Sequence, residues 1–197
     1  LLNAVYRLDG VSSLADGHRW GFFPGLSAGW NVHQEAFFQD TKLAAYISTL
    51  KPRVSHGENG NINGLWRYEV QGTYSLQTNY NGTAGYLNTQ PVNGNLVWET
   101  SKTTGIGLDL GLWHDRVTLL FDYYNRKTNN LLTDLTLPSY IGFSSINTNL
   151  GTLQNKGLEF GLQARILRDP DGINLTIGAN AAFVKNKILE LPNNGNE

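Results

Sequence analysis

A strict alternation of apolar side chains with small or polar ones constrains the fold of this chain more than any other feature. From 104 to 112 the even positions carry threonine, isoleucine and three leucines, whereas the odd positions carry three glycines and one aspartate. The alternation resumes after the His114-Asp115 pair and continues to Tyr124, with Leu120 as one apolar residue on the polar face. A period of two is typical of a β-strand with one apolar face. Residues 98–130 are therefore predicted to form a hairpin of two long strands.

The length of these two strands indicates a membrane. Strands in soluble proteins usually have about five or six residues, whereas a tilted strand needs about 9–11 residues to cross the hydrocarbon of a bilayer. Aromatic side chains near the strand ends favour the boundary between membrane and water, and here they are Trp98, Trp113, Tyr123 and Tyr124. The hairpin thus predicts an all-β fold, an antiparallel transmembrane β-barrel.

Composition agrees with a barrel and excludes several other classes. The 197 residues are 40% hydrophobic and contain no run of about 18 apolar residues, so a helical membrane protein is excluded. The 22 glycines, 11% aromatic residues and 16% charged residues favour an all-β chain with many turns. A net charge of -1 without a basic block argues against a nucleic-acid partner. The lack of cysteine rules out disulfides and thiolate metal sites.

The same alternation recurs along the chain. It predicts seven spanning strands, at residues 1–9, 20–32, 50–57, 98–112, 116–127, 157–168 and 173–186. Pro24 interrupts the second of these, and we expect a bulge there or a later strand start. The period of two is lost over 33–49, where a short helix or compact turn is predicted.

The connections between these strands alternate in length. Those at 113–116 and 168–172 are short, whereas those at 58–97 and 127–156 are long. Outer-membrane barrels have tight periplasmic turns and long extracellular loops, so the two long segments are predicted to be extracellular. Strand direction then requires that the strand-like segment 66–76 lies in an outer loop and does not span the membrane.

Seven is an unusual number of strands for a barrel. Single-chain bacterial barrels have an even number, from about eight upward, so we expect this chain to be one part of a larger barrel. The sequence also opens on a strand-like segment without the features of a signal peptide. We expect either a processed chain or an internal fragment.

Six motifs in order carry a resemblance to a known family. They are WGFFPGLSAGW, GENGNING, NLVWETSKTTGIGLDLG, DRVTLLFDYYNRKTNNLL, LPSYIGFSSINTNLGTLQNKGLEFGL and FVKNKILEL. Together they cover nearly the whole chain and resemble the C-terminal barrel signatures of SusC/RagA-type TonB-linked outer-membrane proteins of Bacteroidetes. Pro52 departs from the family pattern, which usually continues that strand with an aliphatic residue.

The resemblance implies a role for the parent protein. It would be a 22-stranded transporter of the bacterial outer membrane, covered by a SusD-like lipoprotein and importing oligosaccharide or peptide cargo with energy relayed by the TonB complex. The plug and the segment that contacts TonB belong to the N-terminal part of such proteins. We expect no plug domain in this chain, whose residues 1–197 would all belong to the barrel.

Catalytic chemistry has little support in the sequence. The four histidines, His18, His33, His56 and His114, lie in separate segments without a ligand constellation. The Gly105-Ile106-Gly107 triplet lies inside a predicted strand and not in a strand-to-helix turn, so a phosphate loop is not expected. We predict no enzyme activity, no cofactor and no metal site.

Polar and aromatic residues suggest where contacts would form. The predicted inward face carries charged side chains suited to a water-filled bore, namely Glu99, Asp109, Asp122, Glu159 and Arg165. Four aromatic residues of the long loops are candidate ligand or partner contacts, namely Tyr80, Tyr86, Tyr140 and Phe143. They could stack on sugar rings or contact neighbouring loops or a SusD-like partner.

Two alternatives to an importer remain open from the sequence. One is a non-transporting outer-membrane protein, either an adhesin or a passive porin. The other is a soluble carbohydrate-binding sandwich, in which Ile106, Leu110, Phe160 and Ile177 would be covered by a second sheet.

Overall fold

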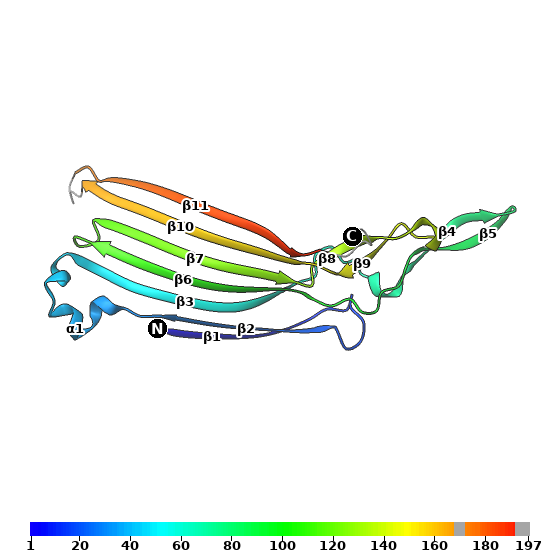
Figure 1. The fold of residues 1–197 in the computed structure, drawn as a ribbon, viewed down its shortest axis with the longest axis horizontal. Helices are drawn as coiled ribbons and strands as arrows, with labels where there is room; N and C mark the ends of the chain where they lie inside the picture. The colour runs from blue at the N-terminus through cyan, green and yellow to red at the C-terminus, as the bar shows by residue number, and fades with distance from the viewer. Residues whose placement is uncertain (168–171, 192–197) are drawn as a thin grey trace.

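A computed structural model describes residues 1–167 and 172–191, and its main element is an open antiparallel sheet of seven strands (Figure 1). The strands are ordered β1 (Leu2–Gly10), β2 (Trp20–Gly29), β3 (Ile47–Asn61), β6 (Glu99–Leu112), β7 (Val117–Asn129), β10 (Thr152–Leu167) and β11 (Leu175–Glu190). The predicted all-β class is thus confirmed, and the sheet does not close on itself. The predicted turn at 168–172 lies almost wholly outside the described residues.

Two small hairpins extend beyond one end of this sheet (Figure 1). One consists of β4 (Thr73–Tyr80) and β5 (Thr83–Gln90), the other of β8 (Leu132–Thr136) and β9 (Ser145–Asn149). The segment 66–76 contributes the 3-10 helix η3 (Glu69–Gln71) and the start of β4. This segment is therefore not part of the seven-stranded sheet, and its predicted place in an outer loop stays a prediction.

The opposite end of the sheet carries the predicted short helices. They are η1 (Val32–Gln34), α1 (Ala36–Gln39) and η2 (Lys42–Ala45). A further 3-10 turn, η4 (Ser139–Ile141), belongs to the other end, where it connects β8 and β9. The tight turn between β6 and β7 lies at the same end as the short helices (Figure 1). Within the described residues, no helix is both long enough and apolar enough to span a membrane.

Several predicted boundaries were wrong. β3 runs from Ile47 to Asn61 and not only over 50–57, because it pairs with β6 along nearly all of this length. β2 ends at Gly29, before the predicted end at 32. The expected bulge or later start at Pro24 was also wrong, since β2 begins at Trp20 and pairs with β1 in unbroken register. β2 pairs with β3 only from Gly25 onward, so Pro24 has no β3 partner that would need its missing N–H group.

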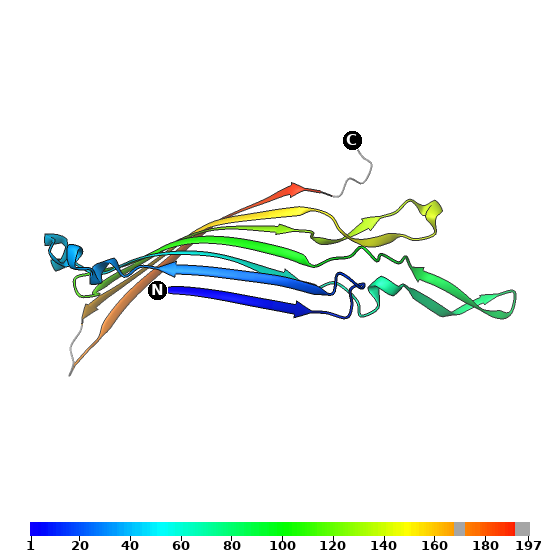
Figure 2. The same cartoon turned by 90° about the horizontal axis from the view of Figure 1, so that it is seen from below.

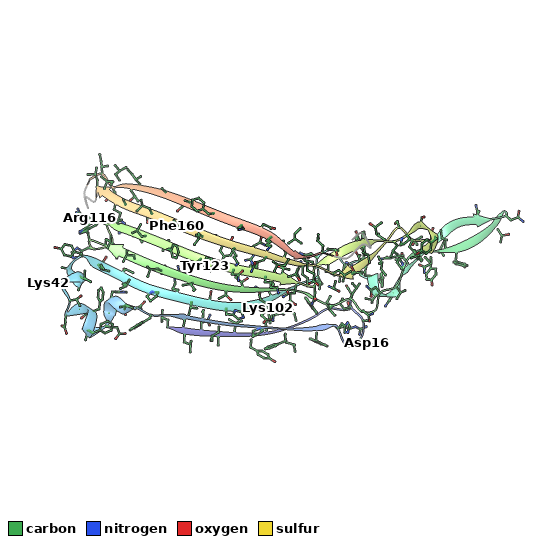
Figure 3. The ribbon with its side chains drawn as sticks, viewed as in Figure 1. Asp16, Lys42, Lys102, Arg116, Tyr123 and Phe160 are labelled. Carbon is green, nitrogen blue, oxygen red and sulfur yellow. The ribbon has the colours of Figure 1, made fainter. Side chains whose placement is uncertain are left out.

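The register places apolar and polar residues on opposite faces of the sheet. One row across five strands consists of Val54, Ile106, Tyr123, Leu158 and Phe183. The neighbouring row, on the other face, consists of Arg53, Gly107, Asp122, Glu159 and Ala182. Figure 3 labels Tyr123 and Phe160 on the paired strands β7 and β10. The two-faced alternation predicted from the sequence is confirmed.

No second sheet covers the apolar face in the described part of the chain. Ile106, Phe160 and Ile177 expose 54%, 44% and 57% of their surface, and Figure 2 shows the seven strands as a single curved layer. A soluble sandwich would bury these side chains between two sheets. The sandwich alternative is therefore excluded for the described residues.

Among the described residues, fully buried apolar side chains lie only near the ends of the sheet. Leu14 and Leu96 are completely buried, and Phe23 is nearly so, where the strands give way to the long loops. The Phe23 ring meets Trp98 edge-on, with ring centroids 5.5 Å apart. At the other end Phe38 of α1 is buried. Between these small cores the sheet is held by its backbone ladders and by contacts between neighbouring side chains along each face.

Candidate functional site: the polar face and the loop assembly

A charged cluster lies in the middle of the polar face. The Arg53 guanidinium on β3 donates from Nε to Asp109 on β6 at 2.9 Å and from Nη2 to Asp122 on β7 at 3.1 Å. The Arg53 side chain is about one-third exposed. One cation thus links three adjacent strands, with a carboxylate on each of the two neighbouring strands.

Glycines on this face make room for such side chains to lie along the sheet. A Cβ atom on Gly107 would lie 2.8 Å from the Arg53 Cζ and would overlap the Asp122 carboxylate. Gly157 on β10 is covered in the same way by the Tyr124 ring. The glycines therefore allow large neighbouring side chains to lie flat against the sheet.

Other predicted inward residues are not part of this cluster. Glu99 accepts hydrogen bonds from the Asn61 amide at 3.1 Å and from the Leu132 backbone N–H at 3.3 Å, at the loop end of the sheet. Glu159 and Arg165 are exposed on the polar face. Arg53 was missed as a site residue in the sequence, although its odd position in the 50–57 strand placed it on the polar face.

The two long loops are joined through one buried carboxylate. Glu69 exposes only 2% of its surface, and its oxygens accept hydrogen bonds from the Asn147 amide at 2.6 Å, from the Gln90 amide and from the Trp66 backbone N–H. Gln90 belongs to β5 and Asn147 to β9. Because burying an unpaired carboxylate is costly, these donors fix Glu69 at the contact between the loops.

Asparagine side chains add further links between the same loops. Asn149 donates to the Val97 carbonyl at 2.9 Å and accepts from the Val97 N–H at 2.7 Å, so it pairs with that residue as a backbone would. Asn93 donates to the Asn147 carbonyl at 2.8 Å. The long segments 58–97 and 127–156 therefore form one hydrogen-bonded assembly beyond the sheet.

This loop assembly carries a cavity of about 490 Å³ that is open to solvent. Its wall combines residues of both loops, namely Gly64, Trp66, Glu69, Thr73, Thr89, Gln90, Pro91, Asp134, Phe143, Ser144, Ser145, Ile146 and Asn147. Hydroxyl, amide and aromatic groups predominate, and the two charged residues in this lining are both acidic. The volume falls within the range of about 300–1,000 Å³ that is usual for small-molecule sites.

The structure separates the four aromatic residues predicted as contacts. Phe143 lines the cavity and is half-buried. Tyr86 on β5 and Tyr140 in η4 are 81% and 87% exposed and are not part of the cavity lining. Tyr80 ends β4, where its backbone pairs with Thr83. Trp66, which shares the cavity with Phe143, was missed in the sequence because nothing local links it to the second loop.

The turn between β6 and β7, at the end of the sheet opposite the loop assembly, has an unusual backbone conformation. Trp113, His114 and Asp115 all have positive φ, between 53° and 58°, a region that is costly for residues other than glycine. The Asp115 carboxylate accepts hydrogen bonds from the Ser48 hydroxyl at 2.7 Å and the Thr49 hydroxyl at 3.0 Å. The Ser48 bond in particular lowers the pKa of Asp115 below its ordinary value.

His18, His33 and His56 each lie within hydrogen-bond distance of a group on a neighbouring segment. His56 hydrogen-bonds to the Thr104 hydroxyl at 2.8 Å, and His18 lies 3.2 Å from the Leu96 carbonyl. His33 contacts the backbone of Leu50. Among the described residues there is no group of three or more His, Asp or Glu side chains placed to hold a metal ion.

Comparison with known proteins identifies relatives over nearly the whole chain. "TonB-dependent receptor P26" of Formosa agariphila is 36% identical over 194 residues, which are 97% of this chain and 19% of the relative. "TonB-dependent receptor SusC" of Bacteroides thetaiotaomicron is 32% identical over 198 residues, again 97% of this chain and 19% of the relative. This chain thus spans about one-fifth of the length of these relatives, which are receptors and not enzymes.

Solved structures of a related importer also match this chain over nearly its whole length. The RagAB peptide importer in its "closed-closed" state superposes with a TM-score of 0.85 at 25% identity, over 96% of this chain and 20% of that one. The "open-open" state of the same importer gives a TM-score of 0.84. The family model described as "TonB dependent receptor-like, beta-barrel" matches residues 1–197. Relatives of the SusC and RagA type are outer-membrane proteins, and the chain belongs to the β-barrel family of TonB-dependent receptors.

Proposed function

We propose that this chain forms part of the barrel wall of an importer that takes up oligosaccharides or peptides together with a SusD-like surface lipoprotein. The observation that carries the proposal is the two-faced register, in which the apolar row through Ile106 is exposed while the polar row through Gly107 holds the Arg53 cluster. A wall between lipid and a water-filled bore needs this arrangement. The relatives named as TonB-dependent receptors support the same reading.

The proposed orientation follows from the two ends of the sheet. The hairpins β4–β5 and β8–β9 would lie outside the cell, within the segments 58–97 and 127–156, and the short helices with the 113–116 turn would face the periplasm. Long external loops and tight internal turns are the rule for such barrels. The plug domain and the segment that contacts TonB would belong to other parts of the receptor.

The exposed loop aromatics fit a role in contact with the partner. Tyr86 and Tyr140 expose most of their surface at positions beyond the sheet, and tyrosine is enriched at protein interfaces. We assign them to the contact with the lipoprotein and keep Tyr80, on the same hairpin as Tyr86, with this group. Loss of lipoprotein binding by Tyr86→Ala or Tyr140→Ala in the full receptor would support this assignment, and unchanged binding by both variants would contradict it.

Orientation can be tested because the chain has no cysteine. In full-length receptor on intact cells that lack the lipoprotein, Tyr86→Cys should react with a membrane-impermeant maleimide, whereas Asp40→Cys should react only after the outer membrane is permeabilised. Labelling of Asp40→Cys in intact cells would reverse the orientation. Any cysteine elsewhere in the receptor is first replaced by serine.

Import itself is tested by growth and uptake. Strains that lack the receptor, the lipoprotein or TonB are compared on oligosaccharide mixtures and on peptide digests as nutrients. We expect one nutrient class to require all three components. Uptake that needs the receptor but not TonB would favour a passive porin, and loss of surface attachment with normal growth would favour an adhesin.

A further inference from the structure

We propose that the cavity between the two long loops is a binding site for neutral oligosaccharides. This inference rests on the proposed function and deepens it, because it names neutral oligosaccharides, and not acidic ones, as the ligands that the loop assembly recognises.

The cavity is preorganised by hydrogen bonds within its lining. Glu69 is fixed by hydrogen bonds from the Gln90 and Asn147 amides, and all three residues line the cavity. Asn93 adds a bond to the Asn147 carbonyl at 2.8 Å. A wall held by buried hydrogen bonds loses little conformational entropy on binding, which favours affinity.

The chemistry of the lining matches that of a sugar ring. A pyranose presents hydroxyl groups at its edge and C–H groups on its faces. Ser144 and Ser145 offer hydroxyls that both donate and accept. The Thr73 and Thr89 hydroxyls already hydrogen-bond to each other at 2.9 Å, and the Gln90 and Asn147 amides donate to Glu69. The Phe143 and Trp66 rings supply apolar surfaces for the C–H faces.

Trp66 is placed to serve as the aromatic platform. It lines the cavity and yet exposes 77% of its surface, so it stands at the mouth and keeps its indole accessible to a ligand. Phe143 comes from the other loop and is half-buried in the same cavity. An entering chain would thus meet one aromatic ring from each loop.

The charge of the lining excludes acidic oligosaccharides as ligands. The lining holds two carboxylates, Glu69 and Asp134, and contains no lysine, arginine or histidine. Uronic acid and sulfated oligosaccharides would find no cation to pair with their charges and would be repelled by Asp134. A neutral sugar can instead donate its hydroxyls to carboxylate oxygens.

Binding is tested on the complete receptor purified in detergent, without its lipoprotein. The probes are maltohexaose, laminarihexaose, xylohexaose and mannohexaose as neutral ligands, with hexagalacturonate and a tryptic peptide digest as comparisons. We expect at least one neutral probe to bind in calorimetry. Its affinity should fall about tenfold in Trp66→Ala and be kept in Trp66→Phe.

A matched control separates the cavity from the hairpin surface. Tyr74 lies next to Thr73 on β4 and is 65% exposed, but it does not line the cavity, so Tyr74→Ala should bind within twofold of the unmodified receptor. Equal losses in Trp66→Ala and Tyr74→Ala would overturn the assignment, as would binding that Trp66→Ala leaves unchanged. Heat-modifiable migration in gels confirms that each variant is assembled.

The remaining outcomes decide between this site and the importer proposal. Binding of hexagalacturonate or peptides with no binding of any neutral probe overturns the neutral-glycan site, and so does the absence of all binding. TonB-dependent uptake of peptides by the same receptor would leave the importer proposal intact in either case. Neutral binding lost in Trp66→Ala without TonB-dependent uptake would leave the site standing and overturn the importer.

Discussion

Gly107 and Asp122 lie directly opposite each other in the β6–β7 pair, and the carboxylate of Asp122 occupies the space that a Cβ atom on Gly107 would need. The Arg53 guanidinium reaches Asp122 across the same glycine, at 3.1 Å. The charged cluster on the polar face therefore depends on the absence of a side chain at position 107.

Substitution of this glycine should weaken the wall. In Gly107→Ala the new methyl group would displace Arg53 and Asp122, and we expect a loss of about 1–2 kcal/mol of stability from overpacking. Gly178→Ala is the matched control, because its Cβ would lie 3.5 Å from the nearest atom, the Leu162 carbonyl oxygen. That variant should be neutral or slightly more stable. The temperature at which the full receptor loses its heat-modifiable gel band measures both, and equal midpoints would contradict the prediction.

The two faces should respond differently to a change of charge. Leu108→Arg places a cation on the proposed lipid-facing side and should cost about 2–4 kcal/mol near mid-membrane. Asp109→Asn, at the next residue on the polar face, removes one of two carboxylates around Arg53 and leaves Asp122 in place. Because Arg53 is partly exposed, this variant should lose less than about 1 kcal/mol.

Assembly into the outer membrane, measured as the folded fraction recovered in membrane preparations, distinguishes these variants. We expect a marked deficit for Leu108→Arg and near-normal recovery for Asp109→Asn. Similar recovery of the two would show that the face assignment is wrong.

The turn between β6 and β7 should lose stability in acid. Hydrogen bonds from Ser48 and Thr49 lower the pKa of Asp115 in the folded protein. A carboxyl group of this kind contributes stability that is fully present above its unfolded pKa of about 3.9 and disappears as the pH falls through the lower folded value. The contribution should be constant from neutral pH to about 5 and decline below about 4.

Thermal midpoints of the receptor between pH 7 and pH 3 test this linkage. Asp115→Asn should have a lower midpoint at neutral pH and a smaller decline in acid than the unmodified protein. Ser48→Ala should bring the pKa of Asp115 back toward its ordinary value and so reduce the acid-dependent decline. Parallel curves for all three proteins would exclude Asp115 as a source of the effect.

Removal of the Glu69 carboxylate should loosen the loops and spare the barrel. In Glu69→Ala the Gln90 and Asn147 amides lose a shared buried acceptor, which costs about 1–3 kcal/mol of local stability. We expect faster cleavage by trypsin or chymotrypsin within 58–97 and 127–156, with an unchanged heat-modifiable band. Gln71→Ala, an exposed neighbour in η3, serves as the control and should be cleaved at the normal rate.

The sequence was sufficient to predict which side chains of a strand lie on the same face of the sheet. Alternation in β6 and β7 predicted which side chains share a face, because period two is a local property of an extended backbone. The ends of β3 were not predicted, since residues such as Asn59 and Asn61 become strand only by pairing with Ser101 and Glu99 of β6. Where pairing with another strand decides where a strand ends, the local sequence carries no pattern that predicts the end.

The site residues show the same division. The position of Asp109 and Asp122 on the polar face could be predicted from the alternation. Their shared ion pair with Arg53 could not, because it depends on the register of three strands. The burial of Glu69 depends on donors that are 21 and 78 residues away in sequence. Contacts of that range are set by the packing of the loops, for which neither alternation nor composition carries a signal.

The glycines beneath Arg53 and Tyr124 have a consequence for the width of the proposed water-filled bore. Arg53 and Tyr124 lie along the strands because Gly107 and Gly157 have no side chain. We therefore expect a larger residue at 107 or 157 to push these groups away from the sheet and to narrow the proposed bore while the strand pairing is kept.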